Sequence, residues 1–227
     1  MGQINKESHG ANKIKMEIII PHLFRMDITK MCLDAIPDSN KIILIDISAT
    51  GEAKNYCENR KKHIQYIRGS GYPNQWSWSK SSNEGAKLCK GDFFIIMNND
   101  ALFNKGEIKK IEKEVKKCDE KIGIIGPCRG MVPIMQFNVY RKKCYDSLGG
   151  FDERFYPCCG EDQDIFLRLA KAGWKYKCIV IDYQHVEGGH HCRIEDPAEQ
   201  YRKFLDKWGF PPSGSKYYEI INKAIIK

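Results

Sequence analysis

Three carboxylates crowd one short segment of this sequence, where they could remove a proton from a hydroxyl group. Glu161, Asp162 and Asp164 precede a stretch of helical apolar spacing, so they lie in the first turn of a predicted helix. The free backbone N–H groups and the helix dipole favour carboxylates there. Because like charges disfavour ionisation, at least one of the three should have a raised pKa, which suits a general base. An ordinary acidic helix N-terminus is the structural alternative.

Two further acidic residues follow apolar stretches that read as buried strands. Asp46 lies near the end of KIILIDI, and Asp100 follows DFFIIM through Asn98 and Asn99. In parallel α/β sheets, ligands bind outside the carboxyl ends of the strands. A carboxylate at such an end can hold Mg²⁺ or Mn²⁺ together with phosphate oxygens. An Asx turn at Asp100 and a helix cap at Asp46 are the structural alternatives.

The elements that must position these residues alternate regularly in the first half. The predicted strands are residues 16–21, 41–47, 63–67 and 92–97, and the predicted helices are residues 27–36, 52–61 and 79–89. Strands that alternate with helices through short links predict a mostly parallel sheet between helices.

The second half continues this α/β pattern less regularly. A helix is expected at 107–117, strands at 122–125, 137–140 and 177–181, a polar turn at 182–191, and helices at 196–208 and 217–226. No linker separates the halves, so one domain is expected. Residues 1–15 read as a disordered tail, and residues 194–227 as C-terminal helices.

Composition narrows the class of protein. The 227 residues suffice for one domain with a real core, and no apolar stretch approaches the roughly 20 residues that span a bilayer. The polar N-terminus lacks the apolar region of a signal peptide, which favours the cytoplasm. The ten cysteines contain no C-x-x-C pair and are expected to be reduced thiols. The net charge of +8 alone does not distinguish between nucleic acid, an anionic membrane and phosphorylated substrates as partners.

Four landmarks in order resemble family 2 glycosyltransferases of the GT-A type. They are IIIP with IILID, then SKSSNEGAKLCKGDFFIIMNND, then GGFDERF with GEDQDIFLRLAKAGW, and last a histidine after the next strand. The third landmark also resembles the C-terminal part of galactosyltransferases with this fold. The resemblance implies a GT-A domain at 16–210, with a nucleotide-sugar-binding half at 16–100 and an acceptor and catalytic half at 101–193.

On the donor side, the resemblance implies a nucleotide-diphosphate sugar, with a UDP-sugar as the first candidate. The implied donor-binding residues are Pro21, Asp46, Asn83 and Asn99. Asp100 and His185 are the implied ligands of a Mn²⁺ or Mg²⁺ cofactor. The family usually has D-x-D where this chain has Asn98-Asn99-Asp100, so the first carboxylate is an amide.

The histidines allow other interpretations as well. His185 could be an ordinary loop histidine, and His190 and His191 with Cys192 raise the alternative of a zinc site. No paired cysteine spacing supplies the remaining zinc ligands.

On the acceptor side, the resemblance implies transfer with inversion, with Asp162 as general base and Glu161 beside it as the second catalytic residue. Gly149, Gly150, Asp164 and Trp174 are expected to contact the acceptor. Glycines let a sugar approach the backbone, and Trp174 offers a stacking face, although an aromatic residue here is more often part of the core. The acceptor would be a glycan, a lipid-linked sugar or a protein, with at most peripheral membrane contact.

Two other classes of protein compete with the enzyme. A catalytically silent module that binds sugar nucleotides or glycans is suggested by Asn98, although Glu161 and Asp162 argue against it. A nucleic-acid-binding protein is suggested by the positive charge, but the sequence has no helix-turn-helix or RNP-like pattern. We therefore expect no nucleic-acid partner.

Overall fold

The computed structural model describes residues 16–60, 63–70, 77–130, 132–186 and 196–226. Its main sheet has the strand order β12-β10-β6-β9-β4-β1-β2-β3. Only β9 runs antiparallel to its neighbours in this sheet. The strands are β1 (Glu17–His22), β2 (Ile42–Asp46), β3 (Ile64–Arg68), β4 (Phe93–Met97), β6 (Ile122–Gly126), β9 (Phe137–Arg141), β10 (Lys175–Cys178) and β12 (Ile225–Ile226). The predicted α/β architecture with a mostly parallel sheet is confirmed.

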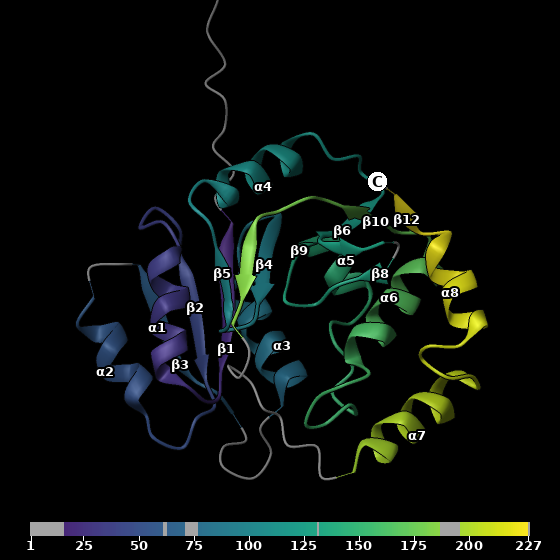
Figure 1. Ribbon diagram of the computed structural model, residues 1–227, viewed down its shortest axis with the longest axis horizontal. Coiled ribbons are helices and arrows are strands. Elements are labelled where there is room, and N and C mark those ends of the chain that lie inside the picture. Colours follow the sequence, from purple (N-terminus) through teal and green to yellow (C-terminus); the bar gives the residue numbers. More distant parts are fainter. Residues whose placement is uncertain (1–15, 61–62, 71–76, 131, 187–195, 227) are drawn as a thin grey trace, which may run out of the picture.

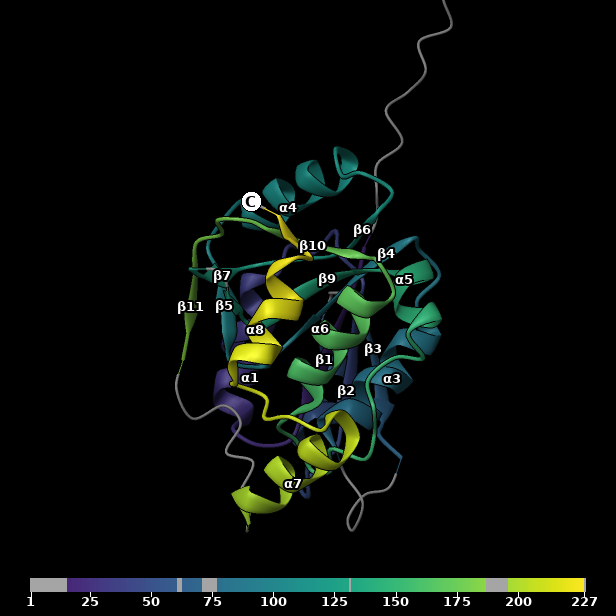
Figure 2. The same cartoon turned by 90° about the vertical axis from the view of Figure 1, so that its right-hand side faces the viewer.

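Helices cover both faces of this sheet (Figures 1 and 2). Successive side chains of a strand point to opposite faces, so Ile19 packs on one side and Ile18 and Ile20 on the other. The Ile18 side holds α1 (Met26–Ala35), α2 (Glu52–Glu58) and α4 (Glu107–Lys116). The Ile19 side holds α3 (Trp78–Leu88), α5 (Lys142–Ser147), α6 (Glu161–Lys171), α7 (Pro197–Trp208) and α8 (Ser215–Asn222).

Local signals start and stop several of these helices. The side chain of Ser77 caps α3 by accepting a hydrogen bond from the backbone N–H of Lys80, at 2.9 Å. Asp196 caps α7 in the same way, Pro197 follows it, and Gly209 ends the helix in a left-handed conformation. Helix α6 begins after Gly160, whose φ of 99° also requires a glycine.

Several short strands and one short helix were not predicted from the sequence. They are β5 (Ala101–Phe103), β7 (Cys128–Arg129), β8 (Val132–Pro133), β11 (Tyr183–His185), β12 and α5. Strand β11 lies within the expected polar turn, and it forms because it pairs antiparallel with β5. Strand β10 begins and ends earlier than the predicted strand, because its register is set by pairing with β6.

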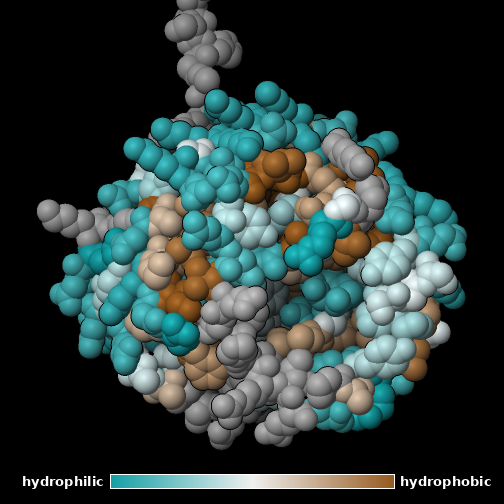
Figure 3. All heavy atoms as spheres, in the orientation of Figure 1, coloured by the Kyte–Doolittle hydropathy of each residue, from teal (hydrophilic) through white to brown (hydrophobic). Residues whose placement is uncertain are grey.

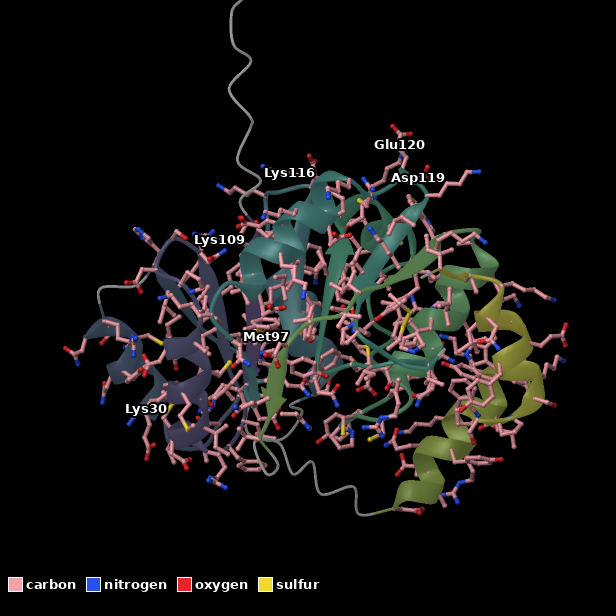
Figure 4. All side chains as sticks on the ribbon, turned by 45° about the horizontal axis from the view of Figure 1, so that its top comes forward. Lys30, Met97, Lys109, Lys116, Asp119 and Glu120 are labelled. Carbon is pink, nitrogen blue, oxygen red and sulfur yellow. A yellow bond between two sulfur atoms is a disulfide. The ribbon has the colours of Figure 1, made fainter. Side chains whose placement is uncertain are left out.

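The expectation that all cysteines are reduced is wrong, because Cys128, Cys158 and Cys178 are disulfide-bonded. Cys128 and Cys178 form a disulfide with a Cα–Cα distance of 5.7 Å (Figure 4). Cys178 lies opposite Gly126 where β10 and β6 pair, and Cys128 follows two residues later, so strand pairing brings the two thiols together. Among the described residues, the cysteines outside disulfides are Cys32, Cys57, Cys89, Cys118, Cys144 and Cys159.

Charged side chains lie around the outside of the molecule. In Figure 4, Lys109, Lys116, Asp119 and Glu120 point outward near α4, whereas Met97 at the end of β4 lies in the interior. Figure 3 shows mostly hydrophilic residues on one face, which is hollowed near its centre. No helix among the described residues has the length and apolar character to cross a membrane.

Candidate active site

The carboxyl ends of the parallel strands bring the candidate residues to one edge of the sheet. Asp46 is the last residue of β2, and the Asn98-Asn99-Asp100 segment follows β4. Helix α6 leads through its C-terminal end into β10, so its first residues, Glu161 and Asp162, belong to the same edge. This edge therefore contains Asp46, the Asn98-Asn99-Asp100 segment and the predicted base.

Asp100 and His185 form the pair that was predicted to hold a cation. Antiparallel pairing places His185 opposite Ala101, the residue after Asp100. His185 Nε2 lies 3.3 Å from Asp100 Oδ1, and Asp100 is buried. Two ligands at right angles on a Mg²⁺-sized ion lie about 2.9 Å apart, so this donor set fits one such cation. Among the described residues, no group of three His, Cys, Asp or Glu side chains could hold a metal.

Asn99 faces the protein interior and is not placed to bind a nucleotide through its amide N–H groups. Its Nδ2 donates to the carbonyl of Phe24 at 3.0 Å and to Oγ1 of Thr29 at 2.7 Å. Next to Phe24, Arg25 adopts a left-handed φ of 58° at the start of α1. Through these two hydrogen bonds, Asn99 connects the turn between β1 and α1 to the end of β4. Pro21, another predicted donor contact, is buried within β1 opposite Ile45.

Asp46 is completely buried and already has three donors. Its carboxylate accepts from the backbone N–H of Ser48 at 2.8 Å and from the hydroxyl of Tyr66 at 2.8 Å, and it pairs with Arg68 at 3.2 Å. The pKa of Tyr66 is raised, first by burial and then by Asp46. Both carboxylate oxygens of Asp46 thus have partners within the protein, whereas Arg68 at the end of β3 is exposed.

Asn83, a further predicted donor residue, instead holds the double-glycine turn. Its Nδ2 donates to the carbonyl of Phe151 and to Glu153, and its Oδ1 accepts from the Phe151 N–H and the Tyr145 hydroxyl, all between 2.7 and 3.0 Å. These four bonds use the full hydrogen-bonding capacity of the amide. A Cβ atom on Gly150 would lie 2.5 Å from Asn83 Oδ1, so the glycine permits this packing. Asn83 therefore has a structural role.

Glu161 and Asp162 are the two acidic residues of this edge whose pKa values are raised. Burial raises the pKa of Glu161 well above its ordinary value, and the charge of Asp162 raises it further. Glu161 Oε2 has no hydrogen-bond partner within the described part of the chain. Burial also raises the pKa of Asp162, which remains partly accessible. The pair thus combines an unsatisfied buried carboxyl with an accessible one.

Asp164 is not available to an acceptor. It is completely buried, and Arg168 binds one of its oxygens at 2.7 Å. The other oxygen accepts from Trp208 Nε1 at 2.9 Å and lies 2.5 Å from Lys207 Nζ. The carboxylate therefore joins α6 to α7, and we leave it out of the acceptor site.

Trp174 lies at the opposite edge of the sheet. It immediately precedes β10, whereas the candidate site is at the carboxyl ends of the strands, and its Nε1 donates to Ser147 at 3.3 Å. The direction of β10 thus separates it from Glu161 at the other end of α6. We leave Trp174 out of the acceptor site as well. The predicted histidine positions 190 and 191, with Cys192, lie outside the described residues.

The sequence matches the family model described as glycosyl transferase family 2 over residues 18–155. This match covers more than half of the chain and includes the strands that end at Asp46 and Met97. The chain belongs to glycosyl transferase family 2. A search of curated protein sequences found no match.

Solved structures of other glycosyltransferases share the fold of this family 2 member. The mannosyltransferase PcManGT from Pyrobaculum calidifontis, in complex with GDP-Man and Mn²⁺, is 14% identical with a TM-score of 0.66, covering 92% of this chain and 68% of that one. S. aureus TarS 1–349 in complex with UDP-GlcNAc is 16% identical with a TM-score of 0.63, covering 92% and 70%. At such low identity, these similarities establish the GT-A fold.

One pocket of this glycosyltransferase lies beside the double glycine. It has a volume of about 370 Å³ and is bordered by Gly149, Gly150, Arg168 and Lys207. A Cβ atom on Gly149 would meet nothing within 4 Å, so this glycine faces open space. Because neither Glu161 nor Asp162 borders the pocket, we do not place the reacting acceptor hydroxyl in it.

Three residues at this edge were not singled out from the sequence. Tyr66 and Arg68 alternate along β3, and Trp78 is the first residue of α3. Each contacts a residue that was predicted: Tyr66 and Arg68 bind Asp46, and Trp78 binds Asn98. The parallel pairing of β3 with β2 brings Arg68 opposite Asp46, and only the strand order reveals it.

Proposed function

We propose that this glycosyltransferase moves a sugar from a nucleotide-diphosphate sugar to an acceptor hydroxyl, with inversion at the anomeric carbon. The observation that carries the proposal is the common edge of the sheet, where the Asp100–His185 pair and the Glu161–Asp162 pair both lie. The neighbours in complex with GDP-Man and with UDP-GlcNAc support a nucleotide-sugar donor. A UDP-sugar remains our first candidate.

In this proposal Asp162 is the general base. The acceptor oxygen attacks the anomeric carbon and gives its proton to Asp162, while the bond from that carbon to the phosphate oxygen breaks. Burial raises the pKa of Asp162, so its carboxylate is a stronger base than an exposed aspartate. Glu161, whose pKa is raised further above its ordinary value, lies beside it and orients the loop before α6.

Asp100 and His185 would hold Mn²⁺ or Mg²⁺. A bound cation would neutralise charge on the leaving nucleoside diphosphate. The two protein ligands leave coordination positions for phosphate oxygens and water, as is usual for these cations. The complex of PcManGT with Mn²⁺ supports this choice of metal.

On the acceptor side, we leave Gly149 out as a contact of the reacting hydroxyl, because the pocket that it borders contains neither Glu161 nor Asp162. We propose that the acceptor is a glycan, a lipid-linked sugar or a protein.

A thermal-shift panel tests the proposal. UDP-, GDP-, dTDP- and CMP-sugars are added with and without Mn²⁺, and a ligand at 100 times its Kd should stabilise the protein by about 2.7 kcal/mol. We expect a shift with one nucleotide class that depends on Mn²⁺, is lost in Asp100→Ala and is kept in Asp162→Asn. The absence of a shift with every nucleotide and Mn²⁺ would contradict the donor site.

A further inference from the structure

Trp78 contacts the first residue of the Asn98-Asn99-Asp100 segment. Its indole Nε1 lies 3.2 Å from Oδ1 of Asn98. An indole N–H can only donate, so the Asn98 atom that faces it must be the carboxamide oxygen. This contact therefore fixes which way the Asn98 amide is turned.

The amide nitrogen of Asn98 is consequently turned away from Trp78. Within the described ranges, no acceptor is found for its two N–H groups, and Asn98 is partly exposed where its two neighbours are buried. Asn99 is occupied by Phe24 and Thr29, and Asp100 faces His185. Of the three residues, Asn98 is thus the one that offers N–H donors at this edge.

Trp78 is itself held in place from two sides. Its ring packs edge-on against Phe151 with the ring centroids 4.8 Å apart. Its backbone N–H donates to the carbonyl of Pro157 at 3.1 Å, in the loop before Glu161. Trp78 therefore joins the end of β4, through its indole, to the segment that leads to the proposed base, through its backbone.

We propose that Trp78 is a positioning residue of the donor site, which turns the Asn98 carboxamide so that it gives N–H donors to the nucleoside diphosphate and no ligand to the cation. The carboxamide oxygen, the side-chain atom that could coordinate a metal, is turned toward the indole, which uses one of its two lone pairs. This inference rests on the proposed function, because it needs a nucleoside diphosphate at this edge. It leaves Asp100 and His185 as the protein ligands of the cation.

The test is calorimetric titration of the full chain with UDP and with GDP, once in EDTA and once with Mn²⁺. The variants are Trp78→Phe, which keeps the ring and removes the donor, Asn98→Ala and Asn98→Asp. Trp174→Phe is the matched control, since it removes an indole donor at the opposite edge of the sheet. Circular dichroism and thermal unfolding check the folding of each variant.

We expect Asn98→Ala and Trp78→Phe to raise the Kd of the nucleoside diphosphate by about 3- to 10-fold in EDTA, as loss of one hydrogen bond implies. Trp174→Phe should bind as wild type does. Asn98→Asp should bind more weakly in EDTA, but with Mn²⁺ it should need a lower metal concentration, because its second oxygen becomes a ligand. If wild type binds only with Mn²⁺, the same ratios are measured at saturating Mn²⁺.

Wild-type affinity in both Asn98→Ala and Trp78→Phe would overturn the inference while leaving the proposed function intact. A loss in Asn98→Ala that is seen only as a higher Mn²⁺ requirement would also overturn it, because Asn98 would then be a ligand. If Trp78→Phe does not fold, the comparison of Asn98→Ala with Asn98→Asp decides. No binding of UDP or GDP to wild type, with Mn²⁺ present, would overturn the proposed function and the inference together.

Discussion

His185 Nε2 lies 3.3 Å from Asp100 Oδ1, although the two residues come from distant parts of the chain. The pairing of β11 with β5 brings them together. The backbone N–H of Val186 also donates to the carbonyl of Asp100 at 2.9 Å, which fixes the strand next to the histidine. Strand pairing and this backbone hydrogen bond therefore fix where the two proposed cation ligands lie.

The first prediction concerns this pair. In His185→Ala and in Asp100→Ala, the Mn²⁺-dependent part of nucleotide binding should be lost, because each variant removes one of two protein ligands. Titration calorimetry with increasing Mn²⁺ measures the effect. The control is His63→Ala, an exposed histidine just before β3, which should bind as wild type does. Equal Mn²⁺ dependence in His185→Ala and His63→Ala would contradict the assignment.

The second prediction concerns the base. Asp162→Asn should lower kcat by about 10²- to 10⁴-fold, the usual contribution of a general base, and should leave donor affinity unchanged. In wild type the rate should rise with pH, because only the ionised carboxylate accepts a proton. Since burial raises the pKa of Asp162, the acid limb should lie above the ordinary value of 3.8. A pH–rate profile measures it, and an unchanged limb in Asp162→Asn would identify a different base.

Much of the fold follows from patterns that act locally. Apolar strands such as those ending at Asp46 and Met97 are recognised from composition, and Ser77 and Asp196 supply real helix caps. The short strands β5 and β11 are different, because they form only through each other. A sequence read along the chain could place His185 after a strand, but it could not show that this residue belongs to a strand itself.

The candidate site was predicted less completely than the fold, and the reason is burial. Asn83 and Asp164 are polar residues inside the stretches whose sequence resembles the family, so the sequence suggests substrate contacts. In the structure both are buried, and neighbouring side chains and backbone groups use their hydrogen-bonding atoms. Whether a polar side chain serves the substrate or the fold depends on its tertiary neighbours, which spacing along the chain does not reveal.

The third prediction follows from the role of Asn83 in the double-glycine turn. Asn83→Ala should lower the free energy of unfolding by about 2–4 kcal/mol, because it removes several buried hydrogen bonds and leaves the Tyr145 hydroxyl and the Phe151 N–H unpaired. Urea unfolding measures the change. The control is Asn104→Ala, whose exposed amide binds Asp182 and should cost about 0.5 kcal/mol or less. Similar effects in the two variants would contradict the structural role.

The fourth prediction uses the buried carboxyl of Glu161. Its pKa is raised in the folded state, first by burial and then by the charge of Asp162, so the folded protein binds more protons than the unfolded chain above the ordinary value of 4.5. Stability is therefore lost as the pH rises from that value through the raised pKa. Glu161→Gln cannot ionise, so it should be more stable than wild type at neutral pH, and the difference should shrink below pH 4.5.

Thermal unfolding from acid to neutral pH measures this difference, with the exposed Glu120→Gln as control (Figure 4). The control should follow wild type, because the Glu120 side chain is exposed. A pH-independent difference between Glu161→Gln and wild type would mean that packing, and not ionisation, sets the effect. A stability gain at neutral pH together with a loss of turnover would show that the acidic pair is kept for catalysis at the expense of stability.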